Sequence, residues 1–209
     1  YRFMKLQEKL KEYQQNKKAL LACNFYNYET LRGTLNAASE LRQPVILQVT
    51  KGSIDYMGLS MTVNMARTAL REFQVEGWLH LDHAEDYELI SRCLDAGFDS
   101  VMIDASEKSF DENVALTRKV VELAESYGAN VEAELGYVAK LGQSSEKSGF
   151  TQPGEAKEFV SRTGVDALAV VIGSANGFYK KKPELQMDLL SEIRRSTNAF
   201  LVLHGGSGI

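Results

Sequence analysis

The chain has 209 residues, of which 44% are hydrophobic, and a formal net charge of −4, which is the composition of an ordinary globular protein. The weak negative charge argues against nucleic acid or an anionic membrane as a partner, and the lysine run Lys180–Lys182 is typical of a solvated loop. No apolar run reaches the roughly 18–20 residues that a membrane-spanning helix needs, and the two cysteines, Cys23 and Cys93, show no pairing pattern, which favours a reduced, cytoplasmic setting.

Short apolar runs alternate with amphipathic helical patterns along the chain. The first half predicts helices over Phe3–Tyr13, Tyr28–Leu41, Met61–Phe73 and Asp86–Ala96, strands over Ala19–Phe25, Pro44–Thr50, Gly77–Leu81 and Asp99–Asp104, and a loop over Lys51–Gly58. The second half predicts helices over Asn113–Tyr127, Gly154–Arg162 and Leu185–Arg195, strands over Asn130–Leu135, Asp166–Gly173 and Ala199–His204, and a long loop over Gly136–Gln152.

This alternation indicates parallel βα units, and the strands are apolar nearly throughout, as expected when helices cover both faces of a sheet. An eight-stranded βα barrel typically needs about 250 residues. We therefore predict an α/β fold, a (β/α)8 TIM barrel, whose eighth βα unit would follow Ile209. A seven-stranded doubly wound sheet is the alternative. The sequence shows no linker, so residues 1–209 are expected to form a single domain.

Chemically active side chains gather at the predicted carboxyl ends of the strands, where βα folds carry out their chemistry. The stretch Trp78–Asp86 is the clearest case, because Asp82 and His83 directly follow a buried strand. An Asp that caps a helix beside a surface His is the alternative interpretation. The other strands end in residues that can bind a metal, move a proton or hold a hydroxyl: Asn24, Thr50, Asp104, Glu134, Asn176 and His204.

Two histidines near carboxylates make a site for zinc or a similar ion plausible, one ligand short of a three-histidine site. These are His83 and His204, whereas His80 is interpreted as a packed core histidine in preference to a residue that supports a ligand. The glycine-rich turn Gly205–Gly208 follows the last predicted strand. In βα barrels the corresponding loop commonly binds phosphate through backbone N–H groups, so phosphate binding is favoured over a simple turn.

These residues together resemble the class II, metal-dependent ketose-bisphosphate aldolases, which include the fructose- and tagatose-bisphosphate enzymes. The resemblance covers essentially the whole chain, with the segments in the family's order and spacing. Each segment alone is weak, but the combination is specific. The segments are CNFYNYET, PVILQVTKGSIDYMG, HLDHAED, AGFDSVMIDAS, VEAELG, RTGVDALAVVIGSANGFY and LVLHGGSGI.

The resemblance implies a TIM barrel that reversibly cleaves a phosphorylated ketose. A divalent metal, usually zinc, would polarise the carbonyl of a dihydroxyacetone phosphate unit. It also implies that Asp82 exchanges a proton with the hydroxyl at the cleaved bond, and that His83 and His204 bind the metal. A homodimer or homotetramer is expected. The other implied positions are the carboxylates Asp104 and Glu134 near the metal, Gly177, Gly205, Gly206 and Ser207 around the phosphate, and Asn24 and Thr50 in the substrate cleft.

The sequence departs from the family pattern in two places. Where the family has its third metal-binding His, this chain has Asn176, and an amide oxygen binds zinc more weakly than imidazole. The loop after VEAELG lacks the family's Gly-Gly and acidic residues, and Glu146 is its one carboxylate.

These departures leave three hypotheses for the function. The protein is an aldolase with a rebuilt metal shell, completed by Asn176, Glu134 or water. It is a non-catalytic paralogue that binds a sugar phosphate or serves as a subunit. Or it is a metal-free enzyme in which Asn176 hydrogen-bonds the substrate carbonyl.

Overall fold

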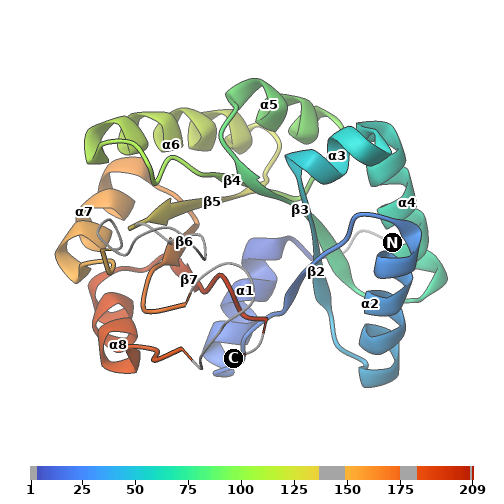
Figure 1. Ribbon diagram of the computed structural model, residues 1–209, viewed down its shortest axis with the longest axis horizontal. Helices are drawn as coiled ribbons and strands as arrows, with labels where there is room; N and C mark the ends of the chain where they lie inside the picture. The colour runs from blue at the N-terminus through green and yellow to red at the C-terminus, as the bar shows by residue number, and fades with distance from the viewer. Residues whose placement is uncertain (1–3, 137–148, 175–182, 208) are drawn as a thin grey trace. The chain divides into compact units, whose positions relative to one another are not determined.

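A computed structural model describes residues 4–136, 149–174, 183–207 and 209 (Figure 1). Its strands are β1 (Ala22–Asn24), β2 (Val45–Thr50), β3 (Gly77–Ala84), β4 (Ser100–Ile103), β5 (Asn130–Leu135), β6 (Ala167–Val170) and β7 (Phe200–Val202). Its helices are α1 (Leu6–Gln15), α2 (Tyr28–Leu41), α3 (Lys51–Met57), α4 (Leu59–Glu72), α5 (Tyr87–Asp95), α6 (Phe110–Glu125), α7 (Pro153–Thr163) and α8 (Met187–Ser196). None of the helices in the described part of the chain could span a membrane.

The strands follow one another in the sheet in the order of the sequence, from β1 to β7. The pairs β1–β2, β2–β3, β3–β4, β5–β6 and β6–β7 are all parallel. A doubly wound sheet reverses its strand order at a switch point, and the described strands show no such reversal. The predicted parallel βα architecture is confirmed, and the doubly wound alternative is wrong.

Helix α3 differs from the sequence prediction, which places a loop over Lys51–Gly58. The Thr50 side chain caps this helix by accepting a hydrogen bond from the Ser53 backbone N–H at 3.4 Å. Gly58, with a φ of 87°, ends it. Ile54 is its one buried residue. A seven-residue helix with a single buried side chain has no apolar period for sequence analysis to detect.

The other differences concern where elements end. Strand β3 continues to Ala84, so Asp82 and His83 lie within the strand and not after it. Strand β7 ends at Val202, so His204 lies two residues beyond it. Helix α1 begins at Leu6, three residues later than predicted. Hydrogen bonding decides these boundaries, and sequence patterns locate them only to within a few residues.

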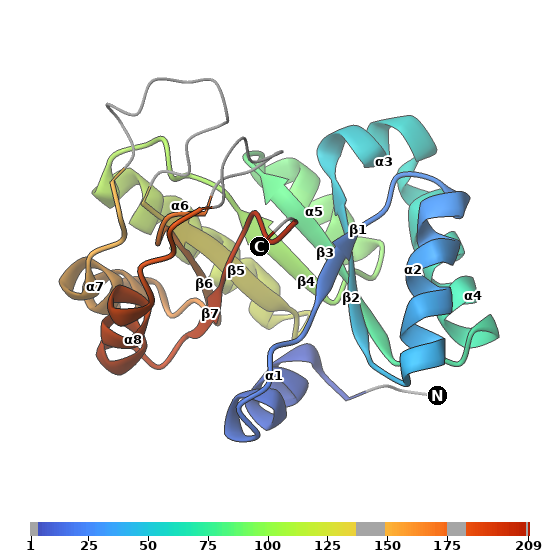
Figure 2. The ribbon, with the colours of Figure 1, turned by 60° about the horizontal axis from the view of Figure 1, so that its bottom comes forward.

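The chain contains two compact parts, and each has its own packed elements. The first part comprises residues 1–103 and 122–131, and the second comprises residues 104–121 and 132–209. In the first part, α2 and α4 lie side by side (Figure 2), and Leu35 of α2 and Ala66 of α4 are fully buried. In the second part, α7 lies beside α8 (Figure 1). Phe159 of α7 packs edge-on against Phe110, with ring centroids 5.9 Å apart. That the whole chain forms one domain remains a prediction.

Helix α1 is attached to the amino-terminal end of β3. Asp82 lies toward the other end of that strand. The Lys9 ammonium contacts Glu76 at 2.9 Å and Glu12 at 3.2 Å. The Trp78 indole N–H donates to the backbone carbonyl of Met4 at 2.8 Å. Burial alone would lower the pKa of Lys9, but the hydrogen bonds and negative charges of Glu76 and Glu12 raise it above its usual value. The ion pair therefore stabilises the folded state.

Replacing Lys9 with methionine is expected to lower the free energy of unfolding by about 1–2 kcal/mol at neutral pH, between the values for exposed and buried ion pairs. Because the folded-state pKa of Lys9 is raised, its contribution is fully present below the unfolded-state pKa of about 10.4 and is lost as pH rises through the folded value. Urea unfolding at neutral pH and at about pH 11 measures both effects. The exposed Lys11→Met variant is the control, and an equal loss in both variants at neutral pH would contradict this role.

Candidate active site

The Asp82 carboxylate is buried and held by two amide side chains from neighbouring strands of the first part. Its Oδ2 accepts hydrogen bonds from Asn24 at 2.8 Å and from Gln48 at 3.4 Å, and the Gln48 amide also donates to the Asn24 side-chain oxygen at 2.7 Å. Among the described residues, Oδ1 has no hydrogen-bond partner although it is buried. One oxygen is therefore anchored, and the other can exchange a proton with a bound molecule.

Asp82 does not cap a helix, which was the alternative interpretation of this stretch. The N-cap of α5 is Asp86, whose side chain accepts a hydrogen bond from the Glu88 backbone N–H at 2.9 Å. Asp82 instead pairs in register with Thr50, the last residue of β2, two residues before the carboxyl end of β3. Asp82, which is only 4% exposed, therefore has no capping role.

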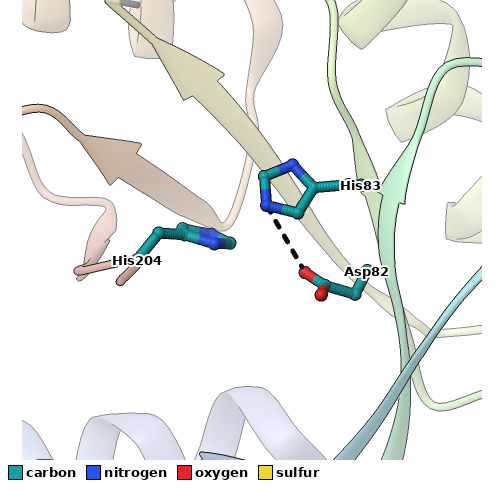
Figure 3. A group of neighbouring side chains, drawn as sticks. All are labelled: Asp82, His83 and His204. Carbon is teal, nitrogen blue, oxygen red and sulfur yellow. Dashed lines mark ion pairs between the residues drawn. The ribbon is translucent and has the colours of Figure 1, made fainter. Parts of the chain in front are cut away.

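His83 has a left-handed backbone, with a φ of 47°, and the β3–β4 register shifts between Leu81 and Ala84. Successive residues of a regular strand point to opposite faces. The irregularity breaks this alternation, and Figure 3 shows the side chains of Asp82 and His83 turned toward each other. His83 Nε2 lies 3.9 Å from Asp82 Oδ1. A non-glycine residue in this region is strained, and such strain is characteristic of functional sites.

His204, also drawn in Figure 3, belongs to the second part and contacts a carboxylate there. Its Nε2 lies 2.8 Å from Oε1 of Glu132, and both residues are largely buried. Glu134 follows on the same side of β5 and is 3% exposed. The Asn113 side chain donates to its backbone carbonyl at 2.9 Å, which ties α6 to this strand. The second part thus presents a histidine and two buried carboxylates.

The remaining predicted residues lie at loops. Asp104 follows β4, and its Oδ1 accepts hydrogen bonds from the backbone N–H and hydroxyl of Ser106 at 3.2 and 2.7 Å. In the turn after β7, Gly205 has a φ of 73°, a conformation that favours glycine, and Gly206 and Ser207 are exposed. Asn176 and Gly177 lie outside the described residues.

The structure thus brings Asn24, Asp82 and His83 together in the first part, with Thr50 opposite Asp82. Gln48 and Glu132 contact predicted site residues, although the sequence analysis assigned neither of them a role. Each lies two positions before a predicted site residue on the same strand and so faces the same side, Gln48 before Thr50 and Glu132 before Glu134. The period of the strand was the signal that could have identified them.

His80 is buried, and its Nδ1 lies 2.7 Å from the hydroxyl of Ser100, as a packed core histidine would be. Each part by itself offers imidazole nitrogens and carboxylate oxygens, from Asp82 and His83 in the first part and from His204, Asp104 and Glu134 in the second. These are the ligands that zinc takes in catalytic sites, so the donor set fits a divalent metal. Burial raises the pKa of the Cys23 thiol, which disfavours a thiolate ligand beside Asn24.

Comparison with known proteins identifies the family. Residues 4–209 match the family model described as fructose-bisphosphate aldolase class-II. The chain is 44% identical over 193 residues to the D-tagatose-1,6-bisphosphate aldolase subunit GatY of Klebsiella oxytoca, covering 90% of this chain and 68% of that protein. It is 42% identical over 211 residues to the fructose-bisphosphate aldolase of Geobacillus stearothermophilus, covering 98% of this chain and 73% of that protein.

Solved structures agree. The YdjI aldolase from Escherichia coli K12 matches with a TM-score of 0.87 at 33% identity, over 98% of this chain and 73% of that chain. A putative fructose-1,6-bisphosphate aldolase from Coccidioides immitis matches with a TM-score of 0.85 at 33% identity, over 96% of this chain and 73% of that chain. With the parallel strand order, this likeness confirms the predicted TIM-barrel fold class. The chain belongs to the class II fructose-bisphosphate aldolase family and is a class II aldolase-like enzyme, a lyase.

Proposed function

We propose that this protein reversibly cleaves a carbon–carbon bond in a phosphorylated ketose. A divalent metal, which we expect to be zinc, would hold the dihydroxyacetone phosphate unit. The observation that carries the proposal is the Asp82 carboxylate. Asn24 and Gln48 anchor one of its oxygens, and the other is buried with no hydrogen-bond partner among the described residues. Aldol cleavage needs a base beside the hydroxyl at the bond that breaks.

In the cleavage direction, Asp82 takes the proton of that hydroxyl. The oxygen then forms a carbonyl, the adjacent carbon–carbon bond breaks, and its electron pair moves toward the carbonyl of the dihydroxyacetone phosphate unit. In the synthetic direction Asp82 returns the proton to the new hydroxyl. Holding one carboxylate oxygen by two amides keeps the other in one orientation, so little reorganisation is needed at the moment of transfer.

His83 and His204 are the proposed metal ligands, with Asn176, Glu134 or Asp104 completing the set. The metal, when bound, polarises the substrate carbonyl as a Lewis acid. The left-handed backbone of His83 supports its role, because it directs the imidazole to the side of the strand that carries Asp82. A second acid–base group would come from the loop after β5, where Glu146 is the one carboxylate between residues 137 and 150.

The phosphate is proposed to bind at Gly177, Gly205, Gly206 and Ser207, with Asn24 and Thr50 lining the substrate cleft. The left-handed Gly205 supports this, since a turn of this kind exposes backbone N–H groups to an anion.

The expected oligomer is a homodimer or homotetramer, and the expected setting is the cytoplasm. Light scattering of the purified protein tests the oligomer.

A second candidate is a sugar-phosphate-binding subunit without catalytic activity. The observation in its favour is Asn176, which stands where the family has a metal-binding histidine. The Klebsiella oxytoca relative is itself named as a subunit. This candidate predicts sugar-phosphate binding without turnover.

Cleavage assays on the full-length protein separate the two candidates. We expect turnover of at least one compound in a panel of ketose mono- and bisphosphates that includes fructose and tagatose 1,6-bisphosphate. A chelator should abolish this turnover and added zinc should restore it, because a metal-polarised carbonyl is needed in every cycle. Turnover that persists in the chelator would overturn the metal's role, and binding without any turnover would leave the second candidate.

A further inference from the structure

We propose that Glu132 is a positioning residue for the metal site: it holds His204 as the Nε2–H tautomer, so that Nδ1 is the nitrogen that binds the metal. This inference rests on the proposed function, in which His204 is a ligand. It concerns only residues of the second part, Glu132 on β5 and His204 just beyond β7.

The contact is short and buried. His204 Nε2 lies 2.8 Å from Glu132 Oε1, with side-chain exposures of 11% and 8%. An ionised carboxylate only accepts hydrogen bonds, so the shared proton belongs to the imidazole Nε2. A ring nitrogen that donates a proton has no lone pair for a metal. Nδ1 therefore remains as the ligand atom.

Strand β5 holds Glu132 in place. In the parallel ladder Glu132 pairs in register with Ala167 of β6, and Glu134 pairs with Ala169. A carboxylate on a paired central strand has few orientations, whereas His204 sits in the turn that follows β7. Glu132 on the strand therefore orients His204 in the turn. Carboxylates that hydrogen-bond metal-binding histidines commonly have this effect.

The consequences of the contact separate this role from that of a structural ion pair. Glu132 and Glu134 are both buried on the same side of β5, two residues and thus about 6.6 Å apart along the strand. A purely structural contact between Glu132 and His204 would affect stability alone, whereas a positioning contact also sets how tightly His204 binds a metal.

The test measures tautomer and metal affinity separately. The chain contains three histidines, so 15N NMR of the metal-free protein can identify the protonated nitrogen of His204. We expect Nε2–H in the unmodified protein and a mixture of tautomers in Glu132→Ala. Zinc affinity, measured by competition with a chelator, should fall about 10–100-fold in Glu132→Ala. Glu132→Gln should lie between, because its amide oxygen still accepts from Nε2–H.

Thr151→Val is the matched control. The Thr151 hydroxyl donates to the Leu135 carbonyl and accepts from the Val171 N–H at 2.8 Å, so it connects the end of β5 to the residue after β6. This variant should lower stability without changing zinc affinity. An affinity loss in Thr151→Val equal to that in Glu132→Gln would reduce Glu132 to a structural role.

The outcomes distinguish this inference from the proposed function. If the unmodified protein binds no zinc, the proposed metal site fails, and the ligand role of Nδ1 fails with it. If the unmodified protein binds zinc but Glu132→Gln and Glu132→Ala bind it equally well, the metal site stands and the role of Glu132 is wrong. A proton on Nδ1 of His204 in the unmodified protein would also overturn it. Glu132→Gln keeps the test decisive if Glu132→Ala fails to fold.

Discussion

Replacing Asp82 with asparagine is expected to reduce kcat for ketose-phosphate cleavage by about 10²–10⁴-fold, the usual contribution of a positioned general base. Asparagine preserves the shape of the side chain and a carbonyl oxygen that can still accept from Asn24. It cannot take the proton of the hydroxyl at the cleaved bond. Because substrate binding does not need that proton transfer, KM should change much less than kcat. Steady-state kinetics on the metal-loaded protein measures both.

Asp86→Asn is the control for this variant, because Asp86 lies in the same stretch and caps α5. Asparagine is an equally good N-cap, so stability and kcat should both stay close to those of the unmodified protein. If Asp82→Asn instead kept kcat within about threefold of the unmodified value, well under the usual general-base effect, the assignment of Asp82 would be wrong.

Replacing His83 with alanine is expected to remove both bound metal and turnover. The His83 imidazole is a proposed metal ligand, and the methyl group of alanine has no atom that can bind a metal. Alanine also retains the unfavourable left-handed backbone, which costs on the order of 1 kcal/mol, so the variant should still fold. Metal analysis, circular dichroism and cleavage assays on one preparation separate loss of metal from loss of structure.

His80→Gln is the matched control, since His80 lies on the same strand and hydrogen-bonds Ser100 in the interior. We expect this variant to be less stable but to retain its metal. A His83→Ala variant that held metal as tightly as the unmodified protein would remove His83 from the proposed ligand set. A His80→Gln variant that lost metal while folded would overturn the interpretation of His80 as a packed core residue.

The parallel βα order was predictable because it rests on hydrophobic periodicity along the chain. Strand β2 illustrates this: its residues alternate between buried and partly exposed, and its apolar run was recognised from sequence. Helix α3 was not predictable, because it contains one buried residue and is defined by the Thr50 cap and Gly58. Its stability depends on the strand before it and not on its own pattern.

Within the site, strand-end residues such as Asp82 and His83 could be identified from sequence by their chemistry. Their arrangement could not. The left-handed backbone of His83 coincides with a register shift between β3 and β4, and register is a property of strand pairing. The hydrogen bond from Asn24 to Asp82 joins residues 58 positions apart, and the contact between Glu132 and His204 joins residues 72 positions apart. Contacts of this range exist only once the sheet has formed.

The proposed metal-dependent aldolase is best tested by measuring the metal content per subunit of the purified full-length protein beside that of an Asn176→His variant. We expect about one tightly bound divalent metal in the unmodified protein, as in a catalytic zinc site, because the proposed ligands His83 and His204 are present and Glu134 and Asp104 are further candidate donors. No metal in the unmodified protein, together with bound metal in Asn176→His, would contradict it. In that case the asparagine at position 176 would be what prevents metal binding.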